Sequence, residues 1–472
     1  MKVTVFGSGS FGTALAAVVA RNGHDVVMLT RRDEVALGIN AHRRNPTHLS
    51  ACELPVNVRA TTNAVEAIAG AGAIVHAIPM QNTEAFLREV GGLVRESGAL
   101  YVNTAKGLRE ETLELMHDVL RRILGEGHPC AFFGGPTFAE ELARGGASGG
   151  VMAAATLELA ERAAALFAGP NMRVYPSTDV VGVEIGGALK NVIAILAGGL
   201  EGMGMGMNAL ALLVTRGCRE MTKLGVAMGA QEHTLAGLAG IGDLMLTCLG
   251  DASRNKAVGI AFGRGAKVTD ILSERAQTLK GVAEGVATAP AAERLAQKLG
   301  IDAPMITTCA QCLRGELDAK GALVRCMTLP ITPDEPVVEV VKRKVKKAAK
   351  SVTAASPKEK AHPIQPVEVA SPKAEVQITT PPEMAASKEK VLEIVKPLEV
   401  AVQTEEAAST KPVLAVESSS VATPKKKTSG MMKTAMTFVV GVAVGVLIGP
   451  ADPRGKKESK GATGHKLSIT YS

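Results

Sequence analysis

The first half of the chain alternates short apolar runs with longer segments of helical period. Residues 2–6 form an apolar run, and residues 13–22 follow with the small and aliphatic side chains of a buried helix. Similar apolar runs recur at residues 24–30, 73–78, 100–104, 130–133, 151–155 and 173–175. Short apolar runs separated by helical segments are typical of parallel strands joined by crossover helices. The pattern therefore predicts an α/β domain with a mostly parallel sheet over residues 1–180.

The pattern changes near residues 178–190. Residues 179–200, 208–228 and 284–299 are long segments rich in Ala, Gly and Leu, and no further strand-like run follows. Helical period without strand signals predicts an all-α second domain over residues 181–335.

Beyond Pro336 the composition changes again. Residues 336–430 mix Pro, Ser, Thr, Lys, Glu, Ala and Val without aromatic residues. Such a segment buries too little apolar surface to offset its ordering entropy, which predicts a disordered linker. Residues 434–451 are uncharged, and Gly441, Gly445 and Gly449 form two G-x-x-x-G steps. This run is slightly shorter than the roughly 20 residues of a membrane span. It predicts a transmembrane anchor at 431–450 and a basic tail at 451–472, with a short apolar segment that docks on protein or aggregates as the alternative.

Charge is distributed unevenly along the chain. Of its 53 Lys and Arg and 46 Asp and Glu, 22 and 15 lie beyond residue 330, so residues 1–330 hold 31 of each. The basic charge therefore belongs to the tail and does not favour nucleic-acid binding by the folded part. All seven cysteines precede residue 331, and their odd number without a signal peptide predicts reduced thiols. Cys309 and Cys312 are interpreted as two thiols one helical turn apart, without a metal or redox role.

The candidate chemistry begins directly after the first apolar run. Gly7, Gly9 and Gly12 form G-x-G-x-x-G between a predicted strand and a predicted helix. Gly7 allows the tight turn, Gly9 lets the backbone approach a pyrophosphate, and Gly12 lets the helix pack on the strand. The helix N-terminus offers amide N–H groups and a partial positive charge to phosphates. We predict a dinucleotide site here, with a structural glycine turn as the alternative.

The end of the second predicted strand selects the coenzyme in this fold. An acidic residue there would bind the ribose of NAD, whereas an Arg would accept the 2′-phosphate of NADP. Arg31 and Arg32 follow this strand directly. They favour NADP, or tolerance of both coenzymes, over a simple solvated basic pair.

Further polar residues occupy the predicted crevice and the helical domain. Lys106 follows the strand at residues 100–104, where side chains face the ligand crevice. Lys190 lies within an apolar helix, where burial requires a partner and makes its pKa easily tuned for proton transfer. Asp243 is a natural partner, and Arg254 with Asn255 would clamp a phosphate. From spacing alone, structural caps and ion pairs explain this set equally well.

Residues 1–330 resemble the NAD(P)-dependent glycerol-3-phosphate dehydrogenase family in its bacterial and plastid form. The matching stretches occur in the family's order and spacing and are residues 7–16, 103–108, 135–141, 186–194, 208, 215–217, 240–248, 253–255 and 284–285. Two departures flank the cofactor site. The second strand lacks an aromatic residue before the basic pair, and Met80 replaces a small polar residue after Pro79. They leave coenzyme preference in doubt more than activity.

The resemblance implies roles for individual residues. It implies that Lys190 is the catalytic lysine, with Lys106 and Asp243 in the catalytic group. The cofactor would contact Gly7, Gly9, Ser10, Phe11, Gly12, Arg31, Arg32, Lys106, Ala139, Arg254, Val282 and Glu284. The substrate would contact Lys106, Gly135, Thr137, Lys190, Asp243, Ser253, Arg254 and Asn255. No metal is expected.

The implied reaction is the reversible reduction of dihydroxyacetone phosphate to sn-glycerol 3-phosphate with NAD or NADP, NADPH being favoured. It would feed glycerophospholipid synthesis. Protonated Lys190 would stabilise the developing oxyanion and then donate a proton. The expected protein is a homodimer with a cytosolic catalytic domain, anchored to an organelle membrane. A ketopantoate-type or 3-hydroxyacid-type reductase and a non-catalytic nucleotide-sensing scaffold are the alternatives.

Overall fold

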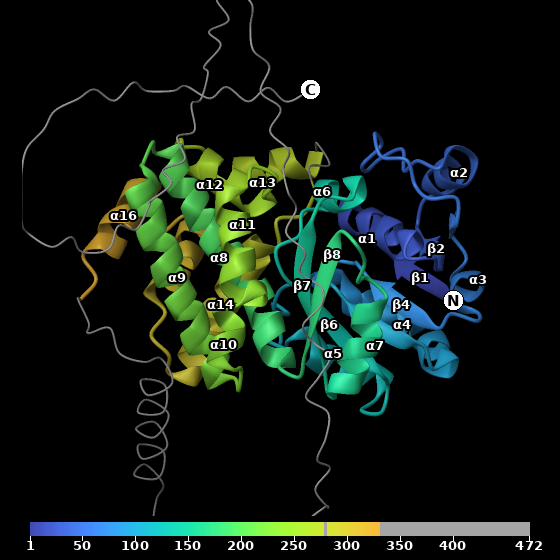
Figure 1. The fold of residues 1–472 in the computed structure, drawn as a ribbon. Coiled ribbons are helices and arrows are strands. Elements are labelled where there is room, and N and C mark those ends of the chain that lie inside the picture. Colours follow the sequence, from blue (N-terminus) through green and yellow to red (C-terminus); the bar gives the residue numbers. More distant parts are fainter. Residues whose placement is uncertain (278–280, 331–472) are drawn as a thin grey trace, which may run out of the picture. The chain divides into compact units, whose positions relative to one another are not determined.

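The computed structural model describes residues 1–277 and 281–330 (Figure 1). The predicted linker at 336–430, the predicted anchor at 431–450 and the basic tail at 451–472 lie outside the described residues.

One eight-stranded sheet forms the N-terminal part. Its strands are β1 (Lys2–Phe6), β2 (Asp25–Leu29), β3 (Val58–Thr61), β4 (Ala73–His76), β5 (Leu100–Asn103), β6 (Cys130–Gly134), β7 (Ser148–Ala154) and β8 (Met172–Ser177). They lie in the order β3-β2-β1-β4-β5-β6-β7-β8, and every pair is parallel except β6 with β7. The order therefore reverses between β1 and β4, as in doubly wound dinucleotide-binding folds.

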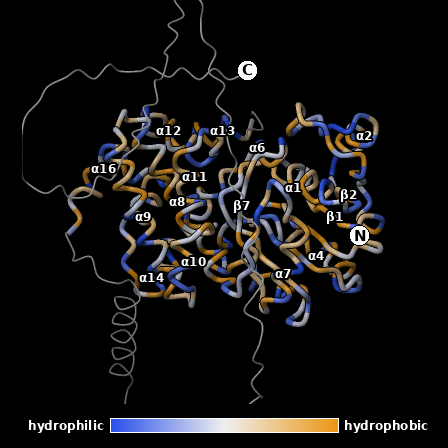
Figure 2. The backbone as a smooth tube through the Cα atoms, viewed as in Figure 1, coloured by the Kyte–Doolittle hydropathy of each residue, from blue (hydrophilic) through white to orange (hydrophobic). Residues whose placement is uncertain are grey.

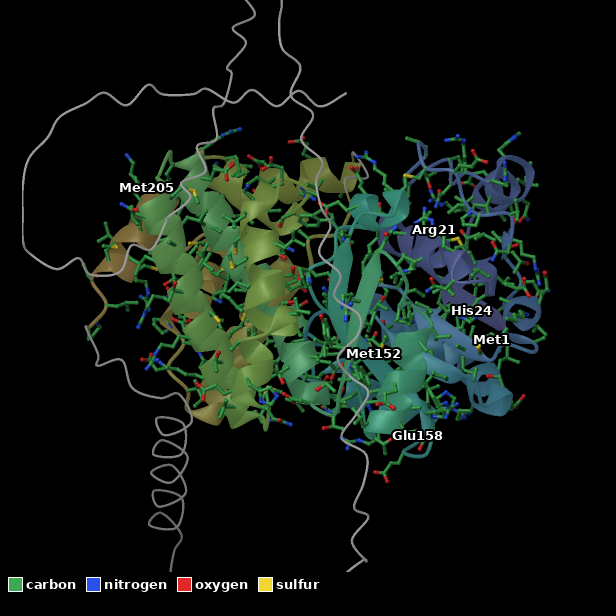
Figure 3. All side chains as sticks on the ribbon, in the orientation of Figure 1. Met1, Arg21, His24, Met152, Glu158 and Met205 are labelled. Carbon is green, nitrogen blue, oxygen red and sulfur yellow. The ribbon has the colours of Figure 1, made fainter. Side chains whose placement is uncertain are left out.

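Helices cover both faces of this sheet. They are α1 (Ser10–Arg21), α2 (Asp33–His42), α3 (Ala64–Ile68), α4 (Met80–Ser97), α5 (Met116–Leu124), α6 (Ala139–Arg144) and α7 (Leu157–Ala165). One core cluster joins α1 to one face, and a second joins α4 and α5 to the other. Figure 2 shows the hydrophobic residues following the strands and α1. Arg21 at the end of α1 (Figure 3) donates to the Leu142 carbonyl oxygen in α6, 3.0 Å away.

The part after β8 is helical. It contains α8 (Val180–Gly202), α9 (Met207–Ala227), α10 (Glu232–Leu235), a π-helical turn η1 (Leu238–Gly242), α11 (Asp243–Leu249), α12 (Arg254–Gly263), α13 (Val268–Gln277), α14 (Glu284–Leu299), α15 (Pro304–Leu313) and α16 (Ala319–Met327). The side chain of Asp179 caps α8, because its Oδ1 accepts from the Gly182 amide at 2.9 Å.

Helix α8 is the centre of the helical part. Within the described residues it is the one single helix long and apolar enough to cross a membrane, and it lies mostly buried inside this protein. Buried residues occur all round it, as expected of a core helix surrounded by others. Its closest neighbour is α12, where glycines on both helices allow backbone contact. The helix that carries Lys190 is therefore packed on several sides.

The predicted α/β part followed by a helical part is confirmed. Each apolar run predicted as a strand contains one, and α1 begins at Ser10, three residues earlier than the periodicity predicts. Two features were not predicted: β3, and the antiparallel direction of β7. Strand β3 lies at the edge of the sheet and alternates buried and more exposed residues over only four positions.

Candidate active site

The candidate site begins at the carboxyl ends of the central strands. The glycine turn follows β1, Pro79 follows β4, the Lys106 segment follows β5 and Gly135 follows β6. These four connections leave the same edge of the sheet, on either side of the point where the strand order reverses. In open α/β sheets this position is the ligand crevice.

The glycine turn has the geometry that a dinucleotide requires. Gly7 has φ +101°, which L side chains rarely adopt, and a Cβ on Gly12 would lie 2.2 Å from the Gly7 carbonyl oxygen. A Cβ on Gly9 would meet no atom within 4 Å, so the turn faces open space there. Ser10 and Phe11 form the first turn of α1, whose amide groups are free to bind an anion. A pyrophosphate therefore fits this turn.

The two arginines after β2 differ in their surroundings. Arg31 is exposed, whereas Arg32 precedes α2 and donates from Nη2 to the Thr47 hydroxyl at 2.7 Å. Glu34 Oε1 lies 3.6 Å from Arg32 Nε. Both arginines lie where the 2′ position of a coenzyme ribose would be, and Arg32 is held in place there.

The second group of predicted residues meets between the sheet and the helical part. Lys190 in α8 donates to Asp243 Oδ1, and its Nζ lies 2.9 Å from the Thr247 hydroxyl. Lys106 Nζ lies 2.6 Å from Asp243 Oδ2 and 3.3 Å from the Gly135 carbonyl oxygen. Asp243 thus bridges two ammonium groups that come from different parts of the fold.

Burial and charge shift the pKa values of this group. Desolvation lowers the pKa of Lys190 to about 8, and the Lys106 charge adds to the shift, whereas Asp243 opposes it. Burial would raise the pKa of Asp243, but the two ammonium groups outweigh it and hold that pKa below its usual value. The site therefore holds an ionised carboxylate beside a lysine that titrates close to neutral pH.

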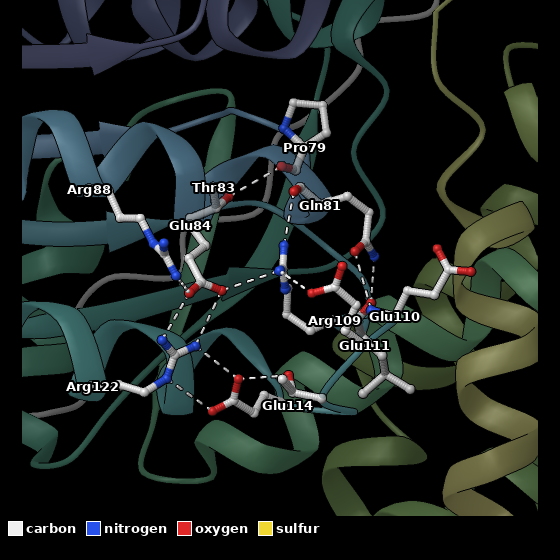
Figure 4. A network of polar contacts seen from close by, with 12 residues as sticks. Pro79, Gln81, Thr83, Glu84, Arg88, Arg109, Glu110, Glu111, Glu114 and Arg122 are labelled. Atoms are coloured by element: carbon white, nitrogen blue, oxygen red, sulfur yellow. Dashed lines mark hydrogen bonds and ion pairs between the residues drawn. The ribbon is translucent and has the colours of Figure 1, made fainter.

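The segment that carries Lys106 is fastened to α4. We call residues 104–115, between β5 and α5, the Lys106 loop. Gln81 donates from Nε2 to the Leu108 carbonyl oxygen at 2.7 Å and accepts at Oε1 from the Glu110 amide at 3.2 Å. Arg109 donates from Nη1 to the Gln81 carbonyl oxygen at 3.0 Å, and its Nη2 lies 3.2 Å from Glu84 Oε2. Figure 4 shows Glu84 among its arginine partners beside this loop.

The predicted phosphate-binding residues lie at the start of α12. Ser253 caps this helix, its hydroxyl accepting from the Lys256 amide at 3.2 Å. Asn255 donates from Nδ2 to Asn191 Oδ1 at 2.8 Å and accepts at Oδ1 from the Gly285 amide at 2.9 Å. Asn255 thus joins α12, α8 and α14 at one point. Arg254 is exposed at the helix N-terminus, where its charge and the free amides would bind an anion.

The remaining predicted residues line the same crevice. Gly135 and Thr137 lie between β6 and α6, and Ala139 is the first residue of α6. Val282 is exposed just before α14, and Glu284 is its first residue. Burial raises the pKa of Glu284, although the nearby charges of Arg254, Lys106 and Lys190 oppose the shift. Glu284 therefore lies among the cationic residues of the site.

The residues of the site fit an organic coenzyme. Within the part of the chain that the structure describes, no group of three or more His, Cys, Asp or Glu side chains forms a candidate metal site. The open space at Gly9, the start of α1 and the arginines after β2 would hold the phosphates and ribose of NAD or NADP. The residues near Lys106 and Glu284 would then face the nicotinamide.

Several residues of the site were not predicted from the sequence. Thr247 lies one helical turn after Asp243 on α11, a helix that was not predicted, so this spacing alone did not identify it. Asn191 adjoins Lys190 but was not assigned a role. Asn45 and Thr47, in the long connection before β3, had no recognised motif. The roles assigned to the predicted residues themselves stay predictions.

Comparisons with known proteins give one consistent family. The model described as the N-terminus of NAD-dependent glycerol-3-phosphate dehydrogenase matches residues 2–160, and the C-terminus model of that enzyme matches residues 179–324. A relative from Brucella ovis named glycerol-3-phosphate dehydrogenase [NAD(P)+] is 41% identical over 334 residues, 71% of this chain and 99% of the relative.

Two further proteins agree. A relative with the same name from Geobacter metallireducens is 42% identical over 330 residues, 69% of this chain and 97% of the relative. The crystal structure of glycerol-3-phosphate dehydrogenase from Coxiella burnetii matches with a TM-score of 0.65 and 30% identity, over 70% of this chain and 99% of that one.

Proposed function

The chain belongs to the NAD-dependent glycerol-3-phosphate dehydrogenase family, and on that premise we propose how its residues perform the reaction. It is an oxidoreductase that interconverts dihydroxyacetone phosphate and sn-glycerol 3-phosphate with NAD(P)H. The observation that supports the proposed mechanism is the pairing of Lys190 and Lys106 with one buried carboxylate, Asp243. When bound, the coenzyme supplies or accepts the hydride.

Lys190 is the proton donor in the reductive direction. Its ammonium group would bind the carbonyl oxygen at C2, stabilise the negative charge that develops on it and transfer a proton to it. The lowered pKa makes that proton easier to give up, and the neutral amine can take a proton in the reverse direction. Lys106 adds a second positive charge beside the oxygen, and Asp243 orients both ammonium groups.

The phosphate group of the substrate provides binding energy remote from the reacting carbon. We assign it to the start of α12, where Ser253, Arg254 and Asn255 meet the helix N-terminus. Gly135 and Thr137 would contact the rest of the substrate from the turn between β6 and α6. Fixing the phosphate orients the C2 carbonyl against the nicotinamide, which raises the rate by positioning.

The test uses the full chain and the variant Lys190→Ala. We expect the wild-type protein to oxidise NADPH or NADH when dihydroxyacetone phosphate is added, and the variant to lose roughly 10²- to 10⁴-fold in kcat. Coenzyme affinity and thermal stability, measured in parallel, should stay near the wild-type values. A variant with nearly full kcat would contradict the assigned role. Preference for an unphosphorylated oxo acid would instead favour a ketopantoate-type or 3-hydroxyacid-type reductase.

We further propose that NADPH is the preferred coenzyme and that the protein is a homodimer. Arg31 and Arg32 support the first proposal, because a 2′-phosphate needs a cationic partner at the end of β2. The ratio of kcat/KM for NADPH and NADH tests it. Analytical ultracentrifugation tests the second, and a monomer at micromolar concentration would contradict it.

The proposed location is a membrane surface facing the cytosol. The uncharged run at residues 434–451, flanked by lysines and arginines, supports an anchor for a cytosolic catalytic domain on an organelle membrane. Glycerol 3-phosphate made there would feed glycerophospholipid synthesis. Nucleic acid is not a proposed partner, because residues 1–330 carry equal numbers of acidic and basic residues.

A further inference from the structure

Asn45 is a fully buried amide that holds the connection between α2 and β3 against the glycine turn. Its Nδ2 donates to the Ser8 carbonyl oxygen and to the Thr13 hydroxyl, each at 2.8 Å. Its Oδ1 accepts from the amides of Thr47 and His48, each at 3.1 Å, and from the Thr47 hydroxyl at 3.0 Å. One side chain with no solvent exposure thus makes five hydrogen bonds. Such satisfied buried amides fix their surroundings rigidly.

These bonds belong to a closed ring around the end of β2. Thr47 accepts from Arg32 Nη2 at 2.7 Å, and the Arg32 amide lies 3.4 Å from the Thr30 hydroxyl. The Thr30 hydroxyl lies 2.8 Å from that of Ser8, whose carbonyl oxygen accepts from Asn45. The ring therefore links the turn that would bind the pyrophosphate to the arginine that would meet the 2′ position of the ribose.

Within residues 1–277 and 281–330, the guanidinium of Arg32 has one polar partner besides Thr47, which is Glu34. Its ion pair with Glu34 is long, 3.6 Å, and Glu34 is exposed. Thr47 is therefore the group that fixes the direction of Arg32, and Asn45 is the group that fixes Thr47. An arginine held in advance loses less side-chain entropy when it binds a phosphate than a free one.

We infer that Asn45, acting through Thr47, is a positioning residue for coenzyme selection, because it holds the Arg32 guanidinium ready for the 2′-phosphate of NADPH. This inference rests on the proposed dinucleotide site. It concerns the difference between NADPH and NADH, which share every group except that phosphate. Loss of the ring should therefore weaken NADPH binding and leave NADH binding, and the hydride transfer itself, nearly unchanged.

The decisive variant is Thr47→Val, which keeps the shape of an exposed side chain but removes the hydroxyl that links Asn45 to Arg32. We expect the KM for NADPH to rise roughly threefold to tenfold, as the loss of one exposed hydrogen bond of ordinary net strength predicts. The KM for NADH and the kcat with either coenzyme should stay within about twofold of wild type, because neither uses the 2′-phosphate contact. Thr47→Ser keeps the hydroxyl and should restore NADPH binding.

Asn45→Ala should act in the same direction, and Asn57→Ala is its matched control. Asn57 lies in the same connection and donates two hydrogen bonds, to the carbonyl oxygens of Ala20 and His24, but does not touch the ring. A merely structural role for Asn45 would lower thermal stability in both variants and change both coenzymes equally. That result, or an unchanged KM for NADPH in Thr47→Val, would overturn the inference.

A binding measurement separates this inference from the proposed catalytic function. Adenosine 2′,5′-bisphosphate carries the 2′-phosphate without the nicotinamide, and AMP lacks that phosphate. We expect Thr47→Val to lower affinity for the bisphosphate threefold to tenfold and to leave the weaker binding of AMP unchanged. Failure of turnover in the wild-type protein would contradict the proposed function only. Equal affinity of the wild-type protein for the two nucleotides would contradict the inference.

Discussion

Lys190 combines deep burial with two polar partners and a nearby positive charge. Desolvation lowers its pKa to about 8, while Asp243 keeps the ammonium form accessible. A catalytic acid works best when its pKa lies near the working pH, because both protonation states are then populated. The environment of Lys190 thus suits a group that must donate a proton in one direction and accept it in the other.

The pH dependence of the two directions should therefore be opposite. Reduction needs the Lys190 ammonium, so its kcat/KM should fall as pH rises through about 8. Oxidation needs the neutral amine and should rise over the same interval. Both profiles can be measured with saturating coenzyme. The phosphate of the substrate titrates at lower pH and therefore does not obscure the transition near pH 8. Two profiles that move in the same direction would contradict Lys190 as the proton donor and acceptor.

Replacing Asp243 by Asn should shift this transition. Asp243 raises the pKa of Lys190. Asp243→Asn should therefore move the pH at which kcat/KM for reduction falls to a lower value, and should also lower the maximum kcat/KM. Thr247→Val is the matched control, because it removes the other hydrogen-bond partner of Lys190 without removing a charge. In Thr247→Val, the pH at which kcat/KM for reduction falls should move much less. An Asp243→Asn profile that keeps the wild-type limb would exclude Asp243 as the group that sets the Lys190 pKa.

The sequence identified the charged residues of the site better than the neutral ones. A lysine in an apolar helix needs a partner when buried, and this argument made Asp243 a natural candidate, which the structure places on Lys190. No such argument exists for Asn45. Its five hydrogen bonds go to three backbone groups and two hydroxyls, and such contacts leave no pattern in the order of residues.

At the scale of elements, the Lys106 loop is held from both sides. Gln81 and Glu84 in the first turns of α4 hold Leu108, Glu110 and Arg109, and Arg294 in α14 donates to the Glu110 carbonyl oxygen. Ion pairs with Arg122 and Arg88 also hold the pKa of Glu84 at about 2, so the carboxylate stays charged at every working pH. The loop is thereby rigid where Lys106 reaches toward Asp243.

Arg109→Ala should disturb the position of Lys106 without touching the substrate. We expect kcat/KM for dihydroxyacetone phosphate to fall roughly tenfold to 100-fold, the scale that small misplacements of catalytic groups cause. The pH at which activity declines should not change, because Glu84 does not titrate there.

Arg88→Ala is the matched control for that change. It also removes an ion pair of Glu84, but the Arg88 side chain is 74% exposed and does not contact the loop in Figure 4. Exposed pairs contribute little, so activity should stay near wild type. Equal losses of kcat/KM in Arg88→Ala and Arg109→Ala would mean that activity depends on the charge of Glu84 and not on its contact with the Lys106 loop.

The pair of helices α8 and α12 depends on glycine at its closest contact. A Cβ on Gly259 would lie 1.9 Å from the Ile195 carbonyl oxygen, so Gly259→Ala must push the helices apart. We expect this variant to lower the free energy of unfolding by about 2–3 kcal/mol, as overpacking does. Gly199→Ala, in α8 with no atom within 4 Å of its added Cβ, should instead add about 0.5–1 kcal/mol. Chemical denaturation measures both, and destabilisation by both changes alike would contradict the packing argument.

Most strands of the sheet were predictable, because buried parallel strands have continuous apolar sequences. Strand β3 was not predicted because Arg59 is exposed and the strand lies at the edge of the sheet, where only one neighbouring strand and one buried face constrain the sequence. The antiparallel direction of β7 could not be predicted either, because an apolar run such as Val151–Ala155 has the same composition in a parallel and in an antiparallel strand. Direction depends on the connection before the strand, which here contains only the short helix α6.

At the scale of the whole molecule, the active group is assembled from distant segments. Asp243 lies 137 positions after Lys106 and 53 after Lys190 in the chain, and the structure brings their charged groups into contact. Spacing along the sequence contains no information about such distances. The resemblance to a family supplied the grouping at the sequence level, and the packing of the helical part against the sheet explains it physically.

The tail provides the prediction that belongs to the whole chain. The uncharged run at residues 434–451 would measure about 27 Å as a helix, close to the roughly 30 Å of a bilayer core. Removing residues 431–472 should therefore move the protein from the membrane to the soluble fraction, while kcat and KM stay unchanged, because every proposed site residue precedes residue 331.

Removing residues 451–472 alone is the control for that truncation. It deletes much of the flanking positive charge but leaves the apolar run nearly intact, so the protein should stay with the membrane after a wash in high salt, which weakens purely electrostatic attachment. Fractionation of cells that produce the three forms, followed by the dehydrogenase assay in each fraction, makes the measurement. Full-length protein in the soluble fraction would contradict the anchor. Salt release of the full chain would show instead that the basic residues hold it at the surface, because a helix that spans the bilayer is held by its buried apolar side chains and not by charge.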